Sequence, residues 1–215
     1  MSPGPRPEFP VARWVLLAFA ATWAPLYWRE YGWRNFLQLC DIAVFLTLLG
    51  IWRGSALLLS SQAVGAMLVD VLWAVDYLGR LFTGRHPIGG TDYMFMDSIP
   101  VFVRALSLFH VVWPAILLWA LCRTGYDRRG WLLQGAIAGA VLVVSRLGPD
   151  PAYNVNFAWK APFINTPVGP APVHLAVCLV ALVLGAYLPT HLILARFYRP
   201  LGPSNSSRSL ETSNE

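Results

Sequence analysis

The sequence is poor in charged residues and nearly free of lysine. Only 13% of its 215 residues are Asp, Glu, Lys or Arg, whereas 56% are hydrophobic, and the mean hydropathy is +0.52. An ordinary soluble domain carries about twice this share of charge. Lys160 is the sole lysine among 16 basic residues. The composition therefore excludes an ordinary soluble domain and predicts an integral membrane protein.

Cysteine is also scarce, and its spacing predicts neither a disulfide framework nor a metal centre. Cys40, Cys122 and Cys178 all fall in apolar runs and form no CxxC or metal-finger pattern. We expect no metal and no cofactor. The formal charge of +5 comes from Arg residues scattered at the ends of apolar runs. That pattern indicates topology signals and lipid headgroups as partners and does not favour nucleic acid.

Long apolar runs predict an all-α, polytopic helical bundle with about six transmembrane helices. Residues 1–10 are expected to be a flexible arm, 11–199 the membrane domain and 200–215 a disordered tail. An excess of Lys and Arg on the terminal side predicts that both termini are cytoplasmic, in what we expect to be a bacterial cytoplasmic membrane. The predicted helices span 11–28, 34–53, 55–78, 98–122, 131–147 and 171–194.

The second predicted helix carries polar groups at a depth where they are costly. Gln38, Cys40 and Asp41 lie about two turns from its Arg34 end, and ionisable groups in that position are usually functional. Cys40 is a candidate nucleophile if a base lies within hydrogen-bond reach. The alternative is that Cys40 packs as a small hydrophobic side chain.

His110, near the middle of the fourth predicted helix, is the best candidate base, because its neutral ring accepts a proton near physiological pH. Pro114 lacks the N–H that would bond the His110 carbonyl, so we expect the helix to bend at His110. A structural histidine that is hydrogen-bonded to a neighbouring helix is the alternative.

Further charged and amide side chains are candidates for binding. Asp41, Asp70, Asp76 and Arg104 are expected to pair near the outer face, either as a headgroup site or as a purely structural network. The segment 148–162 is long, aromatic and rich in Pro and Asn, which is typical of a lid or of an interfacial anchor. Asn154, Asn156 and Lys160 are its candidate ligand-binding residues.

Three segments resemble one known family. Leu39-Cys-Asp-Ile-Ala-Val-Phe-Leu46, the Asn154–Pro162 segment, and Gly169-Pro170 leading into an apolar helix that ends Tyr187-Leu-Pro189 resemble the YwaF and transmembrane-protein-164-like family of six-helix membrane proteins. That family includes an ether-lipid acyltransferase. The resemblance implies that Cys40 accepts an acyl group and that His110 is its base. Where the family tends to have Pro-Leu-His, this chain has Phe36-Leu37-Gln38, and Gln38 cannot take a proton.

Two functions are therefore carried forward. The first is a membrane lipid acyltransferase, or a lipid ester hydrolase like the distantly similar androgen-induced-gene enzymes, with Cys40 and His110 acting on phospholipid or lysolipid. The second is a non-enzymatic protein that binds a lipid or small ligand, or a transporter module. The candidate substrate-binding residues in either case are Gln38, Asp41, Asp70, Arg104, Asn154, Asn156 and Lys160.

Overall fold

The computed structural model describes residues 8–162 and 164–198, which form helices and no strand. The predicted 200–215 tail and most of the 1–10 arm lie outside these residues. Short 3₁₀ turns η1 (Trp33–Leu37), η2 (Asp92–Phe95), η3 (Pro151–Tyr153) and η4 (Val155–Phe157) lie in the connections. The α-helices are α1 (Ala12–Tyr31), α2 (Leu39–Arg53), α3 (Ala56–Thr83), α4 (Val101–Leu106), α5 (Phe109–Thr124), α6 (Gly130–Leu147), α7 (Ala171–Leu182) and α8 (Leu188–Phe197).

Within the described residues, four helical stretches are long and apolar enough to cross a membrane. They are Ala56–Thr83, Val101–Thr124, Gly130–Leu147 and Ala171–Phe197. Helix α2 has 15 residues and spans about 22 Å, less than the roughly 30 Å of bilayer hydrocarbon. A helical membrane protein is thus confirmed by four candidate spans, whereas the predicted count of six is not.

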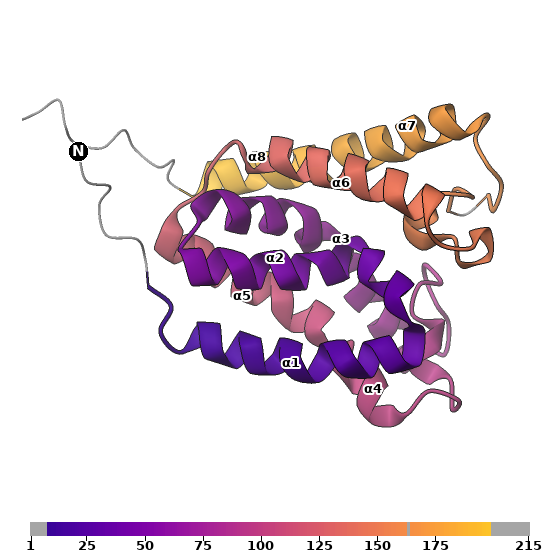
Figure 1. Cartoon of the computed structure of the whole chain (residues 1–215), viewed down its shortest axis with the longest axis horizontal. Coiled ribbons are helices and arrows are strands. Elements are labelled where there is room, and N and C mark those ends of the chain that lie inside the picture. Colours follow the sequence, from indigo (N-terminus) through magenta and orange to yellow (C-terminus); the bar gives the residue numbers. More distant parts are fainter. Residues whose placement is uncertain (1–7, 163, 199–215) are drawn as a thin grey trace, which may run out of the picture.

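The helices run side by side along one axis and give the bundle two ends (Figure 1). At the terminal end lie the start of α1, the end of α8 and the α2–α3 and α5–α6 connections. At the loop end lie the segments 32–38, 84–100, 148–162 and 164–170. Helix α3 is the central element, since it packs against α2, α5 and α6, whereas α1 packs on α2 and α4.

Small and polar residues let α3 and α6 approach closely. A Cβ added to Gly130 would lie 2.7 Å from Ser60 Cβ, so this position admits no side chain. Gln62 and Gln134 are both buried, and the Gln62 amide donates to Gln134 Oε1 at 3.4 Å. Close backbone approach and inter-helix hydrogen bonds are typical of membrane helix pairs, where lipid provides no hydrophobic drive between helices.

Two predicted helices are interrupted close to the candidate site. The second begins at Leu39, five residues later than predicted, because Gln38 is extended (φ −60°, ψ 134°). The fourth breaks at Ser107–Leu108 and not at His110, since 3₁₀-type hydrogen bonds join Ser107 N to Arg104 O and His110 N to Ser107 O. Pro114 therefore sits in the first turns of α5, and the break lies one turn earlier than expected.

The last predicted helix is interrupted by a π turn, η5 (Val183–Tyr187), between α7 and α8. Pro189 follows directly and has no N–H for the carbonyl four residues back. A π turn shifts the hydrogen-bond register, which accommodates the proline within a continuous stretch.

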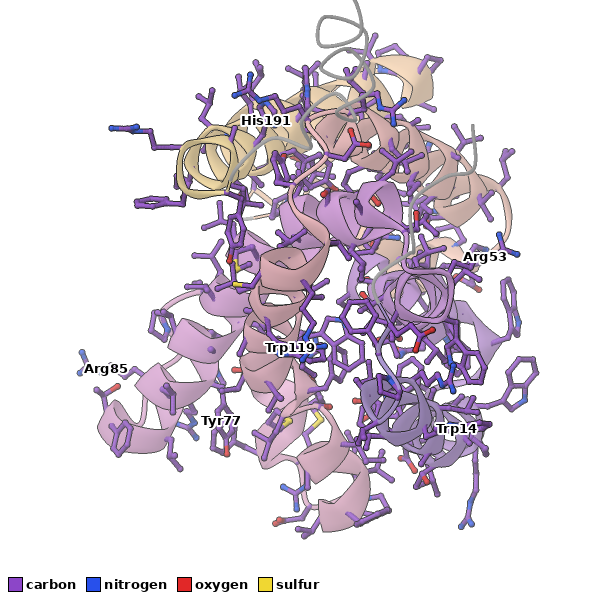
Figure 2. The ribbon with its side chains drawn as sticks, turned by 90° about the vertical axis from the view of Figure 1, so that its left-hand side faces the viewer. Trp14, Arg53, Tyr77, Arg85, Trp119 and His191 are labelled. Atoms are coloured by element: carbon purple, nitrogen blue, oxygen red, sulfur yellow. The ribbon has the colours of Figure 1, made fainter. Side chains whose placement is uncertain are left out.

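Exposed tryptophan and arginine side chains mark the terminal end (Figure 2). Trp14 packs edge-to-face on Trp52, and the Arg13 guanidinium lies over both rings. Arg123 lies over the ring of Trp119 in the same way. Such aromatic and cationic groups are enriched where a protein meets the membrane–water interface.

Candidate functional site

Buried polar side chains gather in the half of the bundle next to the loop end. Tyr27, Asp41, Asp70, Ser107 and His110 each expose no more than 6% of their surface. They come from α1, α2, α3, the α4–α5 break and α5, and we call them the polar cluster. Burying so many polar groups is costly unless they are bonded or serve a ligand, so the cluster is the candidate site.

Asp41 and Asp70 lie at nearly the same depth because α2 and α3 form an antiparallel hairpin. Measured from the turn that joins the two helices, Asp41 lies about 18 Å back along α2 and Asp70 about 21 Å along α3. Gly54, with φ +56°, closes the turn between them. The two carboxyl groups are close enough for their charges to interact.

The two carboxyl groups differ in their hydrogen bonds. Asp41 accepts a hydrogen bond from the Asn35 side-chain amide, and the Cys40 thiol is directed at its Oδ1 from 3.9 Å. Asp70 is 1% exposed, and neither of its oxygens has a hydrogen-bond partner within the described part of the chain. A buried acceptor with no donor is rare in folded proteins and points to a missing ligand, water or proton.

Arg104 does not neutralise the pair. Its guanidinium donates to the Met94 carbonyl at 3.0 Å, and its Nε has no partner among the described residues. The hydroxyl of Tyr31, with which Arg104 interacts electrostatically, is likewise unpartnered. The predicted ion pairing of Arg104 with the aspartates is wrong, because its guanidinium donates to a backbone carbonyl of the 84–100 loop instead.

His110 is held by its own turn of helix. Its Nδ1 lies 2.8 Å from Ser107 O, and because a carbonyl only accepts, Nδ1 carries the hydrogen and Nε2 is the free acceptor of the neutral ring. The ring stacks on Trp73, at 4.6 Å and 11°. The Ser107 hydroxyl bonds the hydroxyl of Tyr27.

Tyr93, in the loop-end turn η2, bonds Trp73, which stacks on His110 of the cluster. Its hydroxyl accepts the Trp73 indole N–H at 3.1 Å. Burial raises the pKa of Tyr93, so the phenol stays neutral and able to donate.

No hydrogen bond joins Cys40 to His110 in residues 8–162 and 164–198. The nearest polar partner of the thiol is Asp41, and that of the imidazole is the Ser107 carbonyl. Reactive thiolates usually lie beside positive groups, and two carboxyl groups do not supply that environment. The catalytic pairing of Cys40 with His110 stays a prediction that the contacts do not support.

The asparagines of the 148–162 segment have positioning roles. Asn156 Oδ1 accepts the Leu39 N–H at 3.1 Å, and its Nδ2 donates to Leu37 O and Ser145 Oγ. It thereby fixes the first turn of α2, next to Cys40. Asn154 instead folds its own loop, since its Oδ1 accepts the N–H groups of Trp159 and Lys160.

The other two candidates are less involved. Lys160 is exposed, and Gln38, half-buried, supplies the extended residue that precedes α2. Neither side chain forms a hydrogen bond to the polar cluster within the part of the chain that the structure describes.

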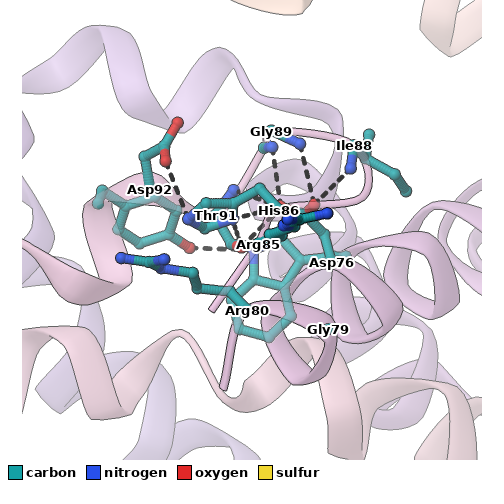
Figure 3. Close-up of polar contacts among 12 residues, drawn as sticks. Asp76, Gly79, Arg80, Arg85, His86, Ile88, Gly89, Thr91 and Asp92 are labelled. Atoms are coloured by element: carbon teal, nitrogen blue, oxygen red, sulfur yellow. Dashed lines mark hydrogen bonds and ion pairs between the residues drawn. The ribbon is translucent and has the colours of Figure 1, made fainter. Parts of the chain in front are cut away.

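A second polar site at the loop end is closed on itself (Figure 3). Asp76 Oδ1 accepts the N–H groups of Ile88 and Gly89, and Oδ2 accepts those of Gly90 and Thr91, at 2.7–2.9 Å. His86 lies between Asp76 and Asp92, at 3.3 and 2.9 Å. Since its own loop uses both oxygens of Asp76, this site fixes the segment and has little capacity for a ligand.

The comparisons with known proteins do not place the chain in a family. No protein-family model matches it, and neither a curated protein nor a solved structure does. The resemblance to the YwaF and transmembrane-protein-164-like family therefore stays a prediction. Among the described residues, no group of three or more His, Cys, Asp and Glu side chains is placed to hold a metal ion.

Sequence reasoning missed several members of the site. Tyr27, Asn35 and Tyr93 were not candidates, although the first two bond members of the cluster and the third bonds Trp73, which stacks on His110. Tyrosines at the ends of apolar helices usually indicate the membrane interface, so Tyr27 and Tyr93 carry no distinguishing signal. Asn35 precedes α2 in a 3₁₀ turn, and its reach to Asp41 depends on the extended Gln38.

Proposed function

We propose that the chain is a non-enzymatic membrane protein that binds a small cationic ligand in the polar cluster, as a binding protein or transporter module. The observation that carries the proposal is Asp70, a buried carboxyl group without a hydrogen-bond donor, within electrostatic range of Asp41. Ionisable groups at this depth mark substrate and ion pathways more often than packing sites.

The chemistry of the cluster favours a positive ligand. Asp41 and Asp70 are both acceptors when ionised, and Arg104 donates to a backbone carbonyl and to neither of them. A cation or an ammonium group would provide the missing charge and donors. Tyr31, whose hydroxyl has no partner in the described chain, could turn to the same ligand.

A groove on the outer face of the same helices supports a lipid as the source of that cation. Its lining is apolar and comes from α1, η1 and α2: Ala24, Pro25, Trp28, Trp33, Phe36 and Phe45. An acyl chain fits such a surface, and the headgroup of a choline or ethanolamine lipid carries the positive charge. The membrane lipids expected as partners from the sequence therefore remain the first ligands to test.

A screen for stabilising ligands tests the proposal. The purified full chain would be unfolded by heat in detergent with sodium, choline or ethanolamine chloride, or short-chain choline lipid, at constant ionic strength. A ligand at about 100 times its Kd stabilises the folded state by about 2.7 kcal/mol. Stabilisation by choline or ethanolamine compounds is the expected result, and none by any cation would contradict the proposal.

The acyltransferase is the second candidate, because one contact favours it. The Cys40 thiol lies in the first turn of α2 and points at Asp41, a possible proton acceptor. A lipid-soluble maleimide distinguishes the two functions. A poised nucleophile at Cys40 reacts faster than exposed Cys122, whereas a packed thiol reacts more slowly. We expect the slower reaction.

A further inference from the structure

The carboxyl pair in the polar cluster has no counter-charge in contact with it. Asp41 and Asp70 are 2% and 1% exposed, so water screens their repulsion poorly. The ion pairs within residues 8–162 and 164–198 join His86 to Asp76 and Asp92, and Arg129 to Asp127, and none involves this pair. Two like charges in a low-dielectric site do not both ionise, and one of the two groups keeps a proton.

The surroundings decide which group keeps the proton. Asp41 accepts from the Asn35 amide and lies in the first turn of α2, where the helix dipole favours a negative charge. Asp70 lies in the middle of α3 and has no donor for either oxygen. Hydrogen-bond donors stabilise the ionised form, and their absence favours the neutral form.

We propose that the pair binds a single proton on Asp70, with Asp41 ionised, so that the ligand site carries one negative charge at neutral pH. The charge of the site has a consequence for the ligand, and that consequence rests on the proposed function. A site with one negative charge fits a ligand with one positive charge, such as a choline or ethanolamine group, better than a divalent cation. The proton assignment itself rests on the burial of the two carboxyl groups and on the difference between their hydrogen bonds.

No other group near the pair supplies the missing charge. Arg104, the cation predicted to pair with the aspartates, donates to Met94 O instead. His110 Nδ1 donates to Ser107 O, and nothing in the contacts ties its ring to either carboxyl group. The titratable groups whose charges interact with the pair are Tyr27, Tyr31 and Cys40, and none of them is a cation.

Infrared spectroscopy tests the assignment, because a protonated carboxyl group has a carbonyl band that shifts in D₂O and is absent from a carboxylate. The full chain in detergent near pH 7 should show this band. Asp70→Asn should lose it, and this variant keeps the net charge of the pair and so should fold. Asp41→Asn should keep it, since Asp70 remains buried. Asp97→Asn, at an exposed loop carboxyl, is the matched control.

The outcomes separate this proposal from the proposed function. A wild-type protein without the band, a band that persists in Asp70→Asn, or a band lost in Asp41→Asn would each overturn the assignment, provided that circular dichroism shows the helices intact. If the band behaves as expected while no cation stabilises the protein, the proposed function fails and the proton site stands.

Discussion

Asn156 holds the start of α2 across 117 positions of sequence, since its side-chain oxygen accepts the Leu39 N–H at 3.1 Å. The same side chain donates to Leu37 O at 2.7 Å and to Ser145 Oγ at 2.9 Å. It therefore replaces the N-cap that Gln38 does not supply. Through this one residue, the loop before α7 controls where Cys40 and Asp41 lie.

Replacing Asn156 by Ala should destabilise the protein. Hydrogen bonds in a part-buried site are lost and unpaired backbone groups remain, at a cost of about 1–3 kcal/mol. Thermal unfolding in detergent measures the change. Asn156→Gly is the control for backbone strain, because glycine tolerates the positive φ of 51° but loses the same hydrogen bonds, and it should be destabilised as well. Equal stability of Asn156→Ala and wild type would show that α2 starts without this contact.

The Asp76 carboxylate should govern the mobility of its loop. Asp76→Asn places an amide group among backbone N–H donors, so the segment from Ile88 to Thr91 loses acceptors. Faster hydrogen exchange of these amides is expected, with little change in the helices. Asp92→Asn removes only the outer contact with His86 and serves as the control. Unchanged exchange in Asp76→Asn would argue that the loop is held by packing.

Two glycines of α6 should respond in opposite ways to the same substitution. Gly130→Ala would place its Cβ 2.7 Å from Ser60 Cβ and 2.9 Å from Ser61 N, and the resulting strain should cost about 1–3 kcal/mol. Gly135→Ala meets its nearest atom at 3.8 Å and gains helix propensity, so it should be neutral or stabilising by up to about 1 kcal/mol. A pair of thermal unfolding curves compares them. Equal changes in stability for the two variants would mean that α6 does not pack closely on α3 at Ser60.

The α5–α6 connection should contribute a pH-dependent stability. The Arg129 guanidinium beside Asp127 lowers the pKa of that carboxyl below its usual 3.8. A lowered pKa stabilises the folded state above the unfolded pKa, and this contribution is lost as the pH falls through the folded pKa. The stability advantage of wild type over Asp127→Asn should therefore shrink below about pH 4. An advantage that is constant with pH would contradict the linkage.

The helical membrane fold was predictable, because apolar runs and their turn residues are local signals. Gly54 ends α2 at the predicted bound, whereas α3 continues five residues past its predicted end at 78, to Thr83 before Gly84; both glycines have positive φ. The position of the break before α5 was not predictable from Pro114 alone, since 3₁₀ bonds around Ser107 move it one turn upstream. The late start of α2 depends on Asn156, a contact that no local pattern encodes.

The candidate site was predictable only in part. The depth of Asp41 and Asp70 follows from hairpin register, which the sequence already contains. The donor to Asp41 does not, because Asn35 comes from a connection whose course depends on tertiary contacts. Arg104 illustrates the limit: charge complementarity predicts an ion pair with the aspartates, yet a backbone carbonyl takes the guanidinium.

The most direct measurement is the affinity of the wild-type protein and of Asp41→Asn for the cation that stabilises best, by isothermal titration near pH 7. Removing the ionised carboxylate of the pair should raise Kd by about 100-fold, which corresponds to about 2.7 kcal/mol. Asp70→Asn, which keeps the charge of the pair, should bind more tightly than Asp41→Asn, and the exposed-loop variant Asp97→Asn should bind as wild type does. Equal affinity of Asp41→Asn and wild type would contradict the claim that the Asp41–Asp70 pair binds the ligand.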